Sequence, residues 1–140
     1  ISLAKMVVKD GEGATKLVEI KVKGAGSDKD AYIIADTVAN SNLVKTAFFG
    51  EDANWGRIIG AVGRAGVPVS PNTIDIYFND IIMVKNSMGC GDAAEAEVAK
   101  VLKESEFAVT IDLNMGTGET TVFTCDFSLD YVRINADYRS

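Results

Sequence analysis

The chain has 140 residues, of which 47% are hydrophobic and 24% are charged, and its formal net charge at pH 7 is -6. This length suffices for one hydrophobic core without disulfides or metals, so we expect residues 1–140 to form a single domain. The acidic balance, without a cluster of Lys and Arg, argues against nucleic acid or an acidic membrane surface as the partner.

Residue types that often carry chemistry are scarce. The chain contains no histidine, and its only two cysteines, Cys90 and Cys125, do not form a CxxC pair. The usual general base and the commonest metal ligand are therefore missing, and we expect no Ser-His-Asp triad, no metal site and no cofactor. The cysteines are interpreted as reduced thiols, and no apolar run approaches the roughly 20 residues of a membrane span, so we expect a cytoplasmic protein.

The first residues have the pattern of the second half of an amphipathic helix. Ile1, Ala4 and Val8 share one helical face, and Gly11 supplies a C-terminal stop. No N-cap residue precedes this half-helix. We therefore expect the chain to be a fragment or a processing product of a longer polypeptide.

Beyond a DGEG turn at residues 10–13, predicted strands and helices follow one another along the chain. Apolar and charged side chains alternate in residues 15–23, which predicts a half-buried strand. Ser27 followed by Asp30 predicts the start of a helix, and Asn54 predicts the start of another. The predicted strands are 15–23, 43–49, 73–78, 81–84, 107–114 and 119–127, and the predicted helices are 1–10, 28–39, 55–65 and 92–105.

The order of these elements favours local strand pairing. Residues 73–84 are predicted to form one hairpin and residues 107–127 a second one, since each contains two alternating stretches joined by a turn. Residues 85–91, which end in GCG, fit a flexible linker better than a phosphate-binding loop. The sequence therefore predicts an α/β (α+β) fold in which about four helices are layered on mixed or antiparallel strands.

Residues 45–66 contain the only tryptophan and a predicted helix with glycines at positions 56, 60 and 63. Each interior glycine costs about 1 kcal/mol relative to alanine, so we expect this side of the helix to pack closely on the sheet, with a ligand as the alternative. A polar cluster lies at the start of this helix. We interpret it as a local ion pair and a helix cap, with a binding site as the alternative. Its members are Glu51, Asp52, Asn54, Trp55 and Arg57.

Two further places offer candidate chemistry. Glu12 lies between two glycines, which allow the backbone and the carboxylate to approach a ligand closely, although a solvated turn is the simpler interpretation. The tail, residues 128–140, is rich in Tyr, Arg, Asn and Asp, and such a tail more often packs against the protein than forms a site. No nucleophile has a candidate base at an informative spacing, so an enzyme would need catalytic groups from outside these residues.

Three stretches resemble one known family. They are DGEGATKLVEIKV at residues 10–22, KTAFFGEDANWGRIIGAVG at 45–63 and YVRINADYRS at 131–140. In sequence, order and approximate separation they are similar to the β chain of the ornithine acetyltransferase (glutamate N-acetyltransferase, ArgJ) family. The resemblance covers essentially the whole chain. It implies a DmpA/ArgJ-like fold and an acyltransferase of arginine biosynthesis that moves acetyl from N-acetylornithine to glutamate.

The resemblance also implies a mechanism and partners. The family precursor cleaves itself before a threonine, whose hydroxyl becomes the nucleophile and whose freed amino group serves as base. An α chain supplies the oxyanion hole and completes an α2β2 heterotetramer, and some members also accept acetyl-CoA. The threonine would fall before Ile1, so no catalytic residue is expected in this chain. The 140 residues alone are therefore expected to be inactive.

Substrate-binding positions of the family carry over onto Glu12, Asn135 and Ser140. Glu12 is suited to the substrate's ammonium group, and the Asn135 amide and the Ser140 hydroxyl are suited to its polar ends. Two other interpretations stay open. One is a non-catalytic regulatory α/β domain that binds a small ligand, and the other is a self-cleaving aminopeptidase of the same architecture.

Overall fold

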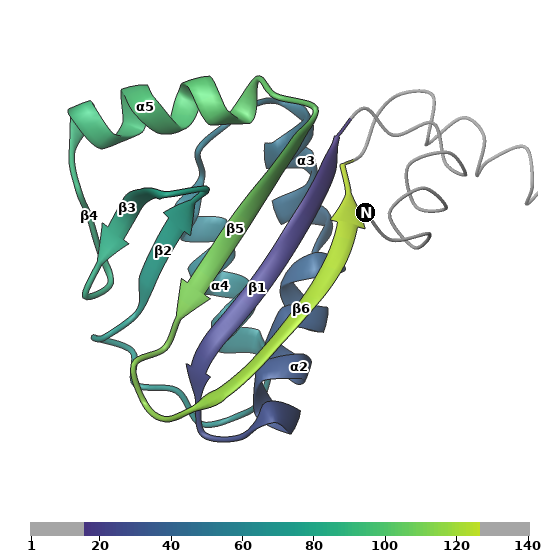
Figure 1. Ribbon diagram of the computed structural model, residues 1–140, viewed down its shortest axis with the longest axis vertical. Coiled ribbons are helices and arrows are strands. Elements are labelled where there is room, and N and C mark those ends of the chain that lie inside the picture. The colour runs from purple at the N-terminus through teal and green to yellow at the C-terminus, as the bar shows by residue number, and fades with distance from the viewer. Residues whose placement is uncertain (1–15, 127–140) are drawn as a thin grey trace, which may run out of the picture.

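A computed structural model describes residues 16–126 of the protein as a mixed sheet with helices on one face (Figure 1). The sheet has six strands in the order β4-β3-β2-β5-β1-β6. The predicted α/β class, with helices layered on mixed strands, is confirmed. The strands are β1 Leu17–Ala25, β2 Asp75–Phe78, β3 Ile81–Lys85, β4 Met88–Gly89, β5 Glu106–Asp112 and β6 Gly118–Cys125, and the helices are α2 Asp28–Ala39, α3 Asn42–Phe49, α4 Trp55–Arg64 and α5 Asp92–Leu102.

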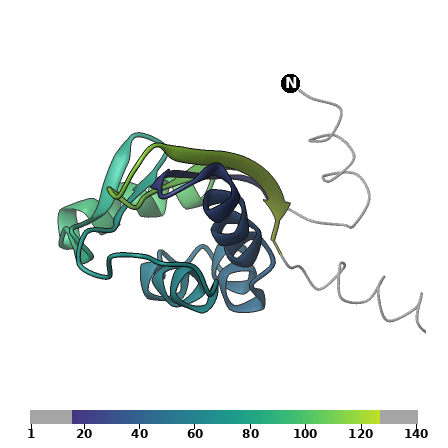
Figure 2. The same ribbon diagram turned by 90° about the horizontal axis from the view of Figure 1, so that it is seen from below.

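One face of the sheet carries the core of the described residues. In β1 the residues Val18, Ile20 and Val22 are fully buried, as the predicted alternation requires. Figure 2 shows α2, α3 and α4 together on one side of the sheet, and α5 packs beside β3. No helix within residues 16–126 is long and apolar enough to span a membrane.

Helix α2 begins and ends where the sequence predicts. The Asp30 backbone N–H donates to Ser27 Oγ at 3.1 Å, which satisfies one of the free donors at the helix start. The residues predicted to face the sheet are fully buried. Strand β1 continues past its predicted end through Gly24, whose φ of +71° favours glycine. A Cβ on Gly24 would also collide with the Asp112 carboxylate.

The prediction of a strand at residues 43–49 is wrong, because this stretch forms α3. The Ser41 hydroxyl accepts a hydrogen bond from the Val44 backbone N–H at 3.3 Å and caps the helix. The buried residues are Val44, Ala47 and Phe48, which have the i, i+3, i+4 spacing of a helix. The run is short, and the apolar but exposed Phe49 directly follows the buried Phe48. The helical spacing therefore cannot be recognised from the sequence.

The prediction of close packing along the glycines of α4 is also wrong within the described residues. The predicted aliphatic stripe faces the core, and the glycines lie on the opposite side of the helix. Gly56 and Gly63 are exposed, and a Cβ on Gly63 would meet no atom within 4 Å. A Cβ on Gly60 would meet only the tip of the Arg64 side chain, at 3.3 Å.

The two predicted hairpins differ in outcome. Strands β2 and β3 pair antiparallel, which confirms the first. The second is wrong, because β1 lies between β5 and β6, parallel to β5 and antiparallel to β6. The connection from β5 to β6 instead crosses the end of β1, where the backbone N–H groups of Met115 and Gly116 both donate to the Gly24 carbonyl. The predicted linker at 85–91 contributes the short strand β4, which pairs with β3.

Candidate functional site

The two ends of the described chain meet at one corner of the sheet. The Lys16 backbone N–H donates to Asp126 Oδ1 at 2.8 Å, and the Asp126 backbone N–H donates to the Lys16 carbonyl at 3.2 Å. In the adjacent pair, Leu17 lies opposite Cys125. Figure 1 shows the start of β1 and the end of β6 side by side at this corner. We call Lys16, Glu51, Glu104 and Asp126 the corner cluster.

The Lys16 side chain joins the corner cluster together. It is only 6% exposed, and its Nζ donates to Glu51 Oε2 at 3.1 Å and to the Glu104 carbonyl at 3.3 Å. Glu104 follows the last turn of α5, and a helix C-terminus attracts a cation. The Leu17 backbone N–H adds a hydrogen bond of 2.8 Å to the Ser105 carbonyl. The start of β1 is therefore fastened to three distant segments of the chain.

Glu51 reaches Lys16 from a left-handed turn after α3. Its φ is +55°, a conformation that a glutamate rarely adopts. Backbone hydrogen bonds hold the turn: Glu51 N–H donates to the Phe48 carbonyl at 3.1 Å, and Asp52 N–H donates to the Ala47 carbonyl at 2.9 Å. The turn directs the Glu51 carboxylate toward β1, although the side chain stays 42% exposed.

The rest of the predicted polar cluster does not gather around Glu51. Asn54 Oδ1 accepts from the Arg57 backbone N–H at 3.3 Å, so the predicted helix cap is confirmed. The Arg57 guanidinium turns to α3 and donates to the Leu43 carbonyl at 2.9 Å. The Trp55 ring lies against β4, where a Cβ on Gly89 would be 3.0 Å from it. These three side chains hold the helices and the sheet edge together, and the ion pair of Glu51 is with distant Lys16.

The predicted substrate-binding residues, Glu12, Asn135 and Ser140, lie outside the described residues. The nearest described neighbours in sequence are Lys16, four residues after Glu12, and Asp126, nine residues before Asn135. Sequence reasoning did not single out Lys16 or Asp126. The available signal was that Lys16 lies inside the DGEGATK stretch, but a lysine that follows a turn fits a solvated position equally well.

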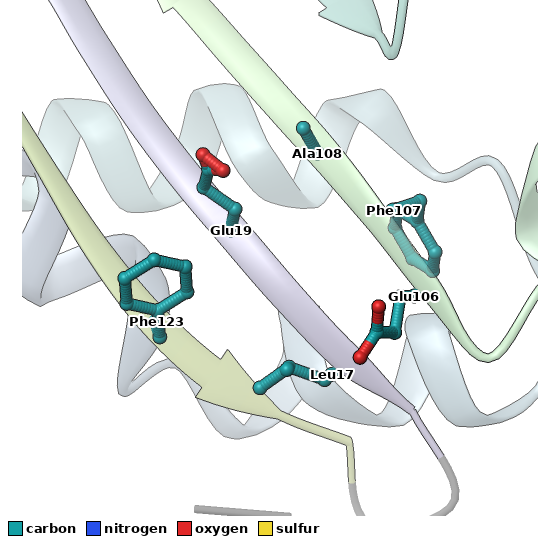
Figure 3. A pocket seen from close by; sticks show the side chains of 6 residues that line it. All are labelled: Leu17, Glu19, Glu106, Phe107, Ala108 and Phe123. Atoms are coloured by element: carbon teal, nitrogen blue, oxygen red, sulfur yellow. The ribbon is translucent and has the colours of Figure 1, made fainter. Parts of the chain in front are cut away.

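The uncovered face of the sheet contains a shallow hollow of about 130 Å³. Figure 3 shows Glu19 of β1 between Ala108 of β5 and Phe123 of β6, and Glu106 farther along β5, beside Leu17. The remaining lining residues are Leu17 and Phe107. Two carboxylates beside apolar walls suit an alkylammonium group, but both glutamates are accessible to solvent. The hollow is therefore a less suitable candidate for a substrate site than the corner cluster.

A second polar group lies at the start of β2. The Asp75 carboxylate accepts hydrogen bonds from the Asn86 backbone N–H at 2.8 Å and from Asn114 Nδ2 at 3.1 Å, and Lys85 Nζ is 3.5 Å away. Burial raises the pKa of Asp75, but these hydrogen bonds and the charge of Lys85 outweigh burial, so the pKa lies below its usual value. Its hydrogen-bond donors lie in the connections after β3 and after β5, and Lys85 is the last residue of β3, which indicates a structural role. No group of acidic or cysteine side chains in residues 16–126 is arranged to hold a metal ion.

Comparisons with known proteins agree along the whole chain. The model of the ArgJ family matches residues 1–140. The "Arginine biosynthesis bifunctional protein ArgJ" of Geobacter sulfurreducens is 58% identical over 140 residues, which are 100% of this chain and 36% of that protein. The protein of the same name from Desulfotalea psychrophila is 56% identical, with the same coverage. The chain thus spans about a third of the length of these curated relatives.

A solved structure has the same fold. The crystal structure of the arginine biosynthesis bifunctional protein ArgJ from Bacillus halodurans superposes with a TM-score of 0.91 and 46% identity. The match covers 97% of this chain and 64% of the chain in that crystal structure. At this identity the likeness supports common ancestry as well as a common fold.

Proposed function

Because the chain belongs to the ArgJ family, we propose that it forms part of a glutamate N-acetyltransferase of arginine biosynthesis. The enzyme would transfer acetyl from N-acetylornithine to glutamate, releasing ornithine and N-acetylglutamate. The observation that carries this proposal is the family match over all 140 residues, which includes the three stretches that resemble the β chain. The name of these relatives, arginine biosynthesis bifunctional protein, supports the same assignment.

The proposed chemistry uses a threonine that precedes these residues in the longer polypeptide. Its hydroxyl oxygen attacks the acetyl carbonyl of N-acetylornithine, and its free amino group carries the hydroxyl proton to the departing ornithine nitrogen. The acetyl group is then esterified to the threonine. The amino nitrogen of glutamate attacks this ester, and the threonine hydroxyl is regained as N-acetylglutamate leaves. An α chain would provide the oxyanion hole for both tetrahedral intermediates.

In this proposal the 140 residues bind substrate and supply no catalytic group. Glu12 holds the substrate's ammonium group, and Asn135 and Ser140 hydrogen-bond to its polar ends. The paired ends of the described chain support this arrangement. Glu12 precedes Lys16 by four residues, and Asn135 follows Asp126 by nine residues. These short separations in sequence from the paired ends support the proposal that both residues bind one small molecule.

The proposed assembly is an α2β2 heterotetramer in the cytoplasm, without a cofactor, a nucleic acid or a membrane partner. Acetyl-CoA is proposed as an additional acetyl donor. Because the nucleophile and the oxyanion hole belong to other parts of the enzyme, the 140 residues alone would have no acetyltransferase activity.

A direct assay tests the proposal. The full-length gene product and the 140-residue polypeptide are each incubated with N-acetylornithine and glutamate, and ornithine release is measured. We expect release by the full-length product alone, and intact mass should show one acetyl group on a threonine when glutamate is omitted. If the full-length product instead hydrolyses peptide amides and does not transfer acetyl, it is an aminopeptidase and the proposal is wrong.

A further inference from the structure

The uncovered face of the sheet carries charges of both signs in an ordered arrangement. Residues directly opposite each other on paired strands point to the same face, so Glu19 shares this face with Ala108. Lys21, two residues farther along β1, shares it with Thr110. Helices α2, α3 and α4 lie on the other side of the sheet (Figure 2). Lys21 is exposed and the other three side chains are half-buried, so a partner can reach all four.

The acidic part of this face is the hollow of about 130 Å³ that Glu19 and Glu106 line (Figure 3). Its walls include the apolar side chains of Leu17 and Phe123. Within residues 16–126 neither glutamate forms an ion pair. An alkylammonium group suits such a hollow, because its methylene groups pack on the apolar walls while its charge pairs with the carboxylates.

The same face supplies an alkylammonium group. The Lys21 side chain is exposed and forms no ion pair within the described range, whereas the neighbouring Lys23 Nζ is 3.9 Å from Asp112. Lys21 does not pair with Glu19 of its own chain, although the two are consecutive on this face of β1. An acidic hollow and an unpaired lysine thus lie side by side, and this arrangement is complementary to itself when one copy faces another.

We propose that the uncovered face is an interface with a second copy of this chain, in which Lys21 of each copy enters the hollow of the other and pairs with Glu19. A two-fold axis at right angles to β1 and level with Ile20 produces this contact, because it places the residue after Ile20 over the residue before it. The contact then occurs twice. The inference rests on the proposed function in one respect, namely that the two copies are the β chains of the heterotetramer.

The side chains around the two charges allow the two sheets to approach. Packed sheets lie about 10 Å apart, a gap across which a lysine can reach. Because Thr110 lies opposite Lys21 and Ala108 opposite Glu19, the same axis places Thr110 of one copy over Ala108 of the other. Small side chains of β5 therefore meet in the middle of the interface. The charge pairs fix the register and orientation of the two copies more than their affinity.

The test uses charge reversal in the full-length gene product. Lys21→Glu brings like negative charges together at the hollow of the other copy, and Glu19→Lys brings like positive charges together. The double variant with both changes restores opposite charges in exchanged positions. The control is Glu97→Lys, a reversal on the exposed surface of α5. Circular dichroism checks that each variant folds.

Analytical ultracentrifugation over a range of concentrations measures the dissociation constant for the association of two αβ units. We expect each single reversal to raise this constant about tenfold or more, because two like-charge contacts form between each pair of copies. The double variant should return to within about threefold of the wild type, since attraction is regained. Glu97→Lys should leave the constant unchanged.

The outcomes decide both the interface and its occupant. A wild type that stays a single αβ unit, a folded single reversal with an unchanged constant, or a double variant as weak as the single ones overturns the proposal. A reversal that releases the α chain from the β chain, seen by electrophoresis of the separated species, shows that the α chain covers this face and also overturns it. If Glu19→Lys does not fold, Lys21→Glu decides the question.

Acetyl transfer, measured on the same samples, keeps this inference apart from the proposed function. A wild type that associates as expected and responds to the reversals, but does not transfer acetyl, overturns the proposed function and leaves the interface in place. A wild type that transfers acetyl while its association ignores the reversals overturns the interface alone.

Discussion

Asp75 and Asp112 lie directly opposite each other on the neighbouring strands β2 and β5. Two like charges in this position repel, but each carboxylate has a lysine of its own. Lys85 Nζ is 3.5 Å from Asp75, and Lys23 Nζ is 3.9 Å from Asp112. Asn114 also contacts both aspartates, through its side chain to Asp75 and its backbone N–H to Asp112. The uncovered face of the sheet therefore contains a charge-balanced group that ties the four strands β1, β2, β3 and β5 together.

Replacing Asp75 with Asn should destabilise the full-length protein at neutral pH by about 1 to 3 kcal/mol, because two partly buried hydrogen bonds and the Lys85 ion pair lose a charged acceptor. The pKa of Asp75 is lowered on folding from its ordinary value of 3.8. Its stabilising effect is thus fully present above that pH and is lost as the pH falls through the folded pKa. Thermal unfolding should show a gap between wild type and variant that narrows below about pH 4. Asp80→Asn, in the exposed β2–β3 turn, is the control; a constant gap would contradict the prediction.

Two glycines should respond oppositely to alanine. A Cβ on Gly118 would collide with the Ser27 backbone, which cannot move without disturbing the start of α2, so Gly118→Ala should cost about 2 kcal/mol or more. Gly63 lies in α4 with nothing within 4 Å of its Cβ position. Gly63→Ala should therefore raise stability by about 0.5 to 1 kcal/mol. Thermal unfolding midpoints of the two variants check this. A destabilised Gly63→Ala variant would mean that another surface covers these glycines in the assembled protein.

The helix assignment of residues 42–49 has its own test. Ser41→Ala should destabilise the protein by about 1 kcal/mol, because the Val44 backbone N–H loses its cap, and Ser27→Ala should do the same for α2. Ser105 contributes only its backbone carbonyl to the described contacts, so Ser105→Ala is the matched control. Chemical denaturation compares the three variants. If Ser41→Ala behaves like the control, the cap does not stabilise α3.

Substrate affinity should depend on Glu12 and not on the hollow of the uncovered face. In the full-length protein, Glu12→Gln removes the charge proposed to hold the substrate's ammonium group and should raise the KM for N-acetylornithine about tenfold or more. Glu19→Gln changes a carboxylate that lines the hollow and should leave KM within about twofold. Initial-rate kinetics at several substrate concentrations decide the matter. If Glu19→Gln raises the KM and Glu12→Gln does not, the substrate binds in the hollow.

Local patterns predicted the elements whose periodicity is unambiguous. The alternation in β1 and the capped, i, i+3, i+4 pattern of α2 fit only one structure each, so both predictions are confirmed. Residues 43–49 were too short and too apolar for periodicity to distinguish a strand from a helix. Of the candidate site, the sequence indicated the DGEGATK stretch and Glu51. It could not indicate that Lys16 and Glu51 meet, because that contact depends on tertiary structure.

The pairing of β1 with β5 and β6 also could not be predicted from the sequence. Two alternating stretches separated by a short turn favour a hairpin, yet β1 lies between β5 and β6. The hydrogen bonds that decide this run from Met115 and Gly116 to the carbonyl of Gly24, about 90 residues earlier. Their donors lie in the β5–β6 connection, which looks like a local turn in the sequence. Pairing between distant segments is fixed by the assembled sheet and leaves no short-range signature.

The insertion of β1 between the two last strands has a consequence for the protein during its synthesis. β1 leaves the ribosome before β5 and β6, which are the strands within residues 16–126 that pair with it. Until then the hydrophobic side of β1 can be covered by α2, but the hydrogen-bonding groups along both of its edges have no strand partner. A nascent chain that stalls before β6 would keep one such edge open, available to a second nascent chain. Synthesis of β6 is thus a condition for closing the centre of this sheet.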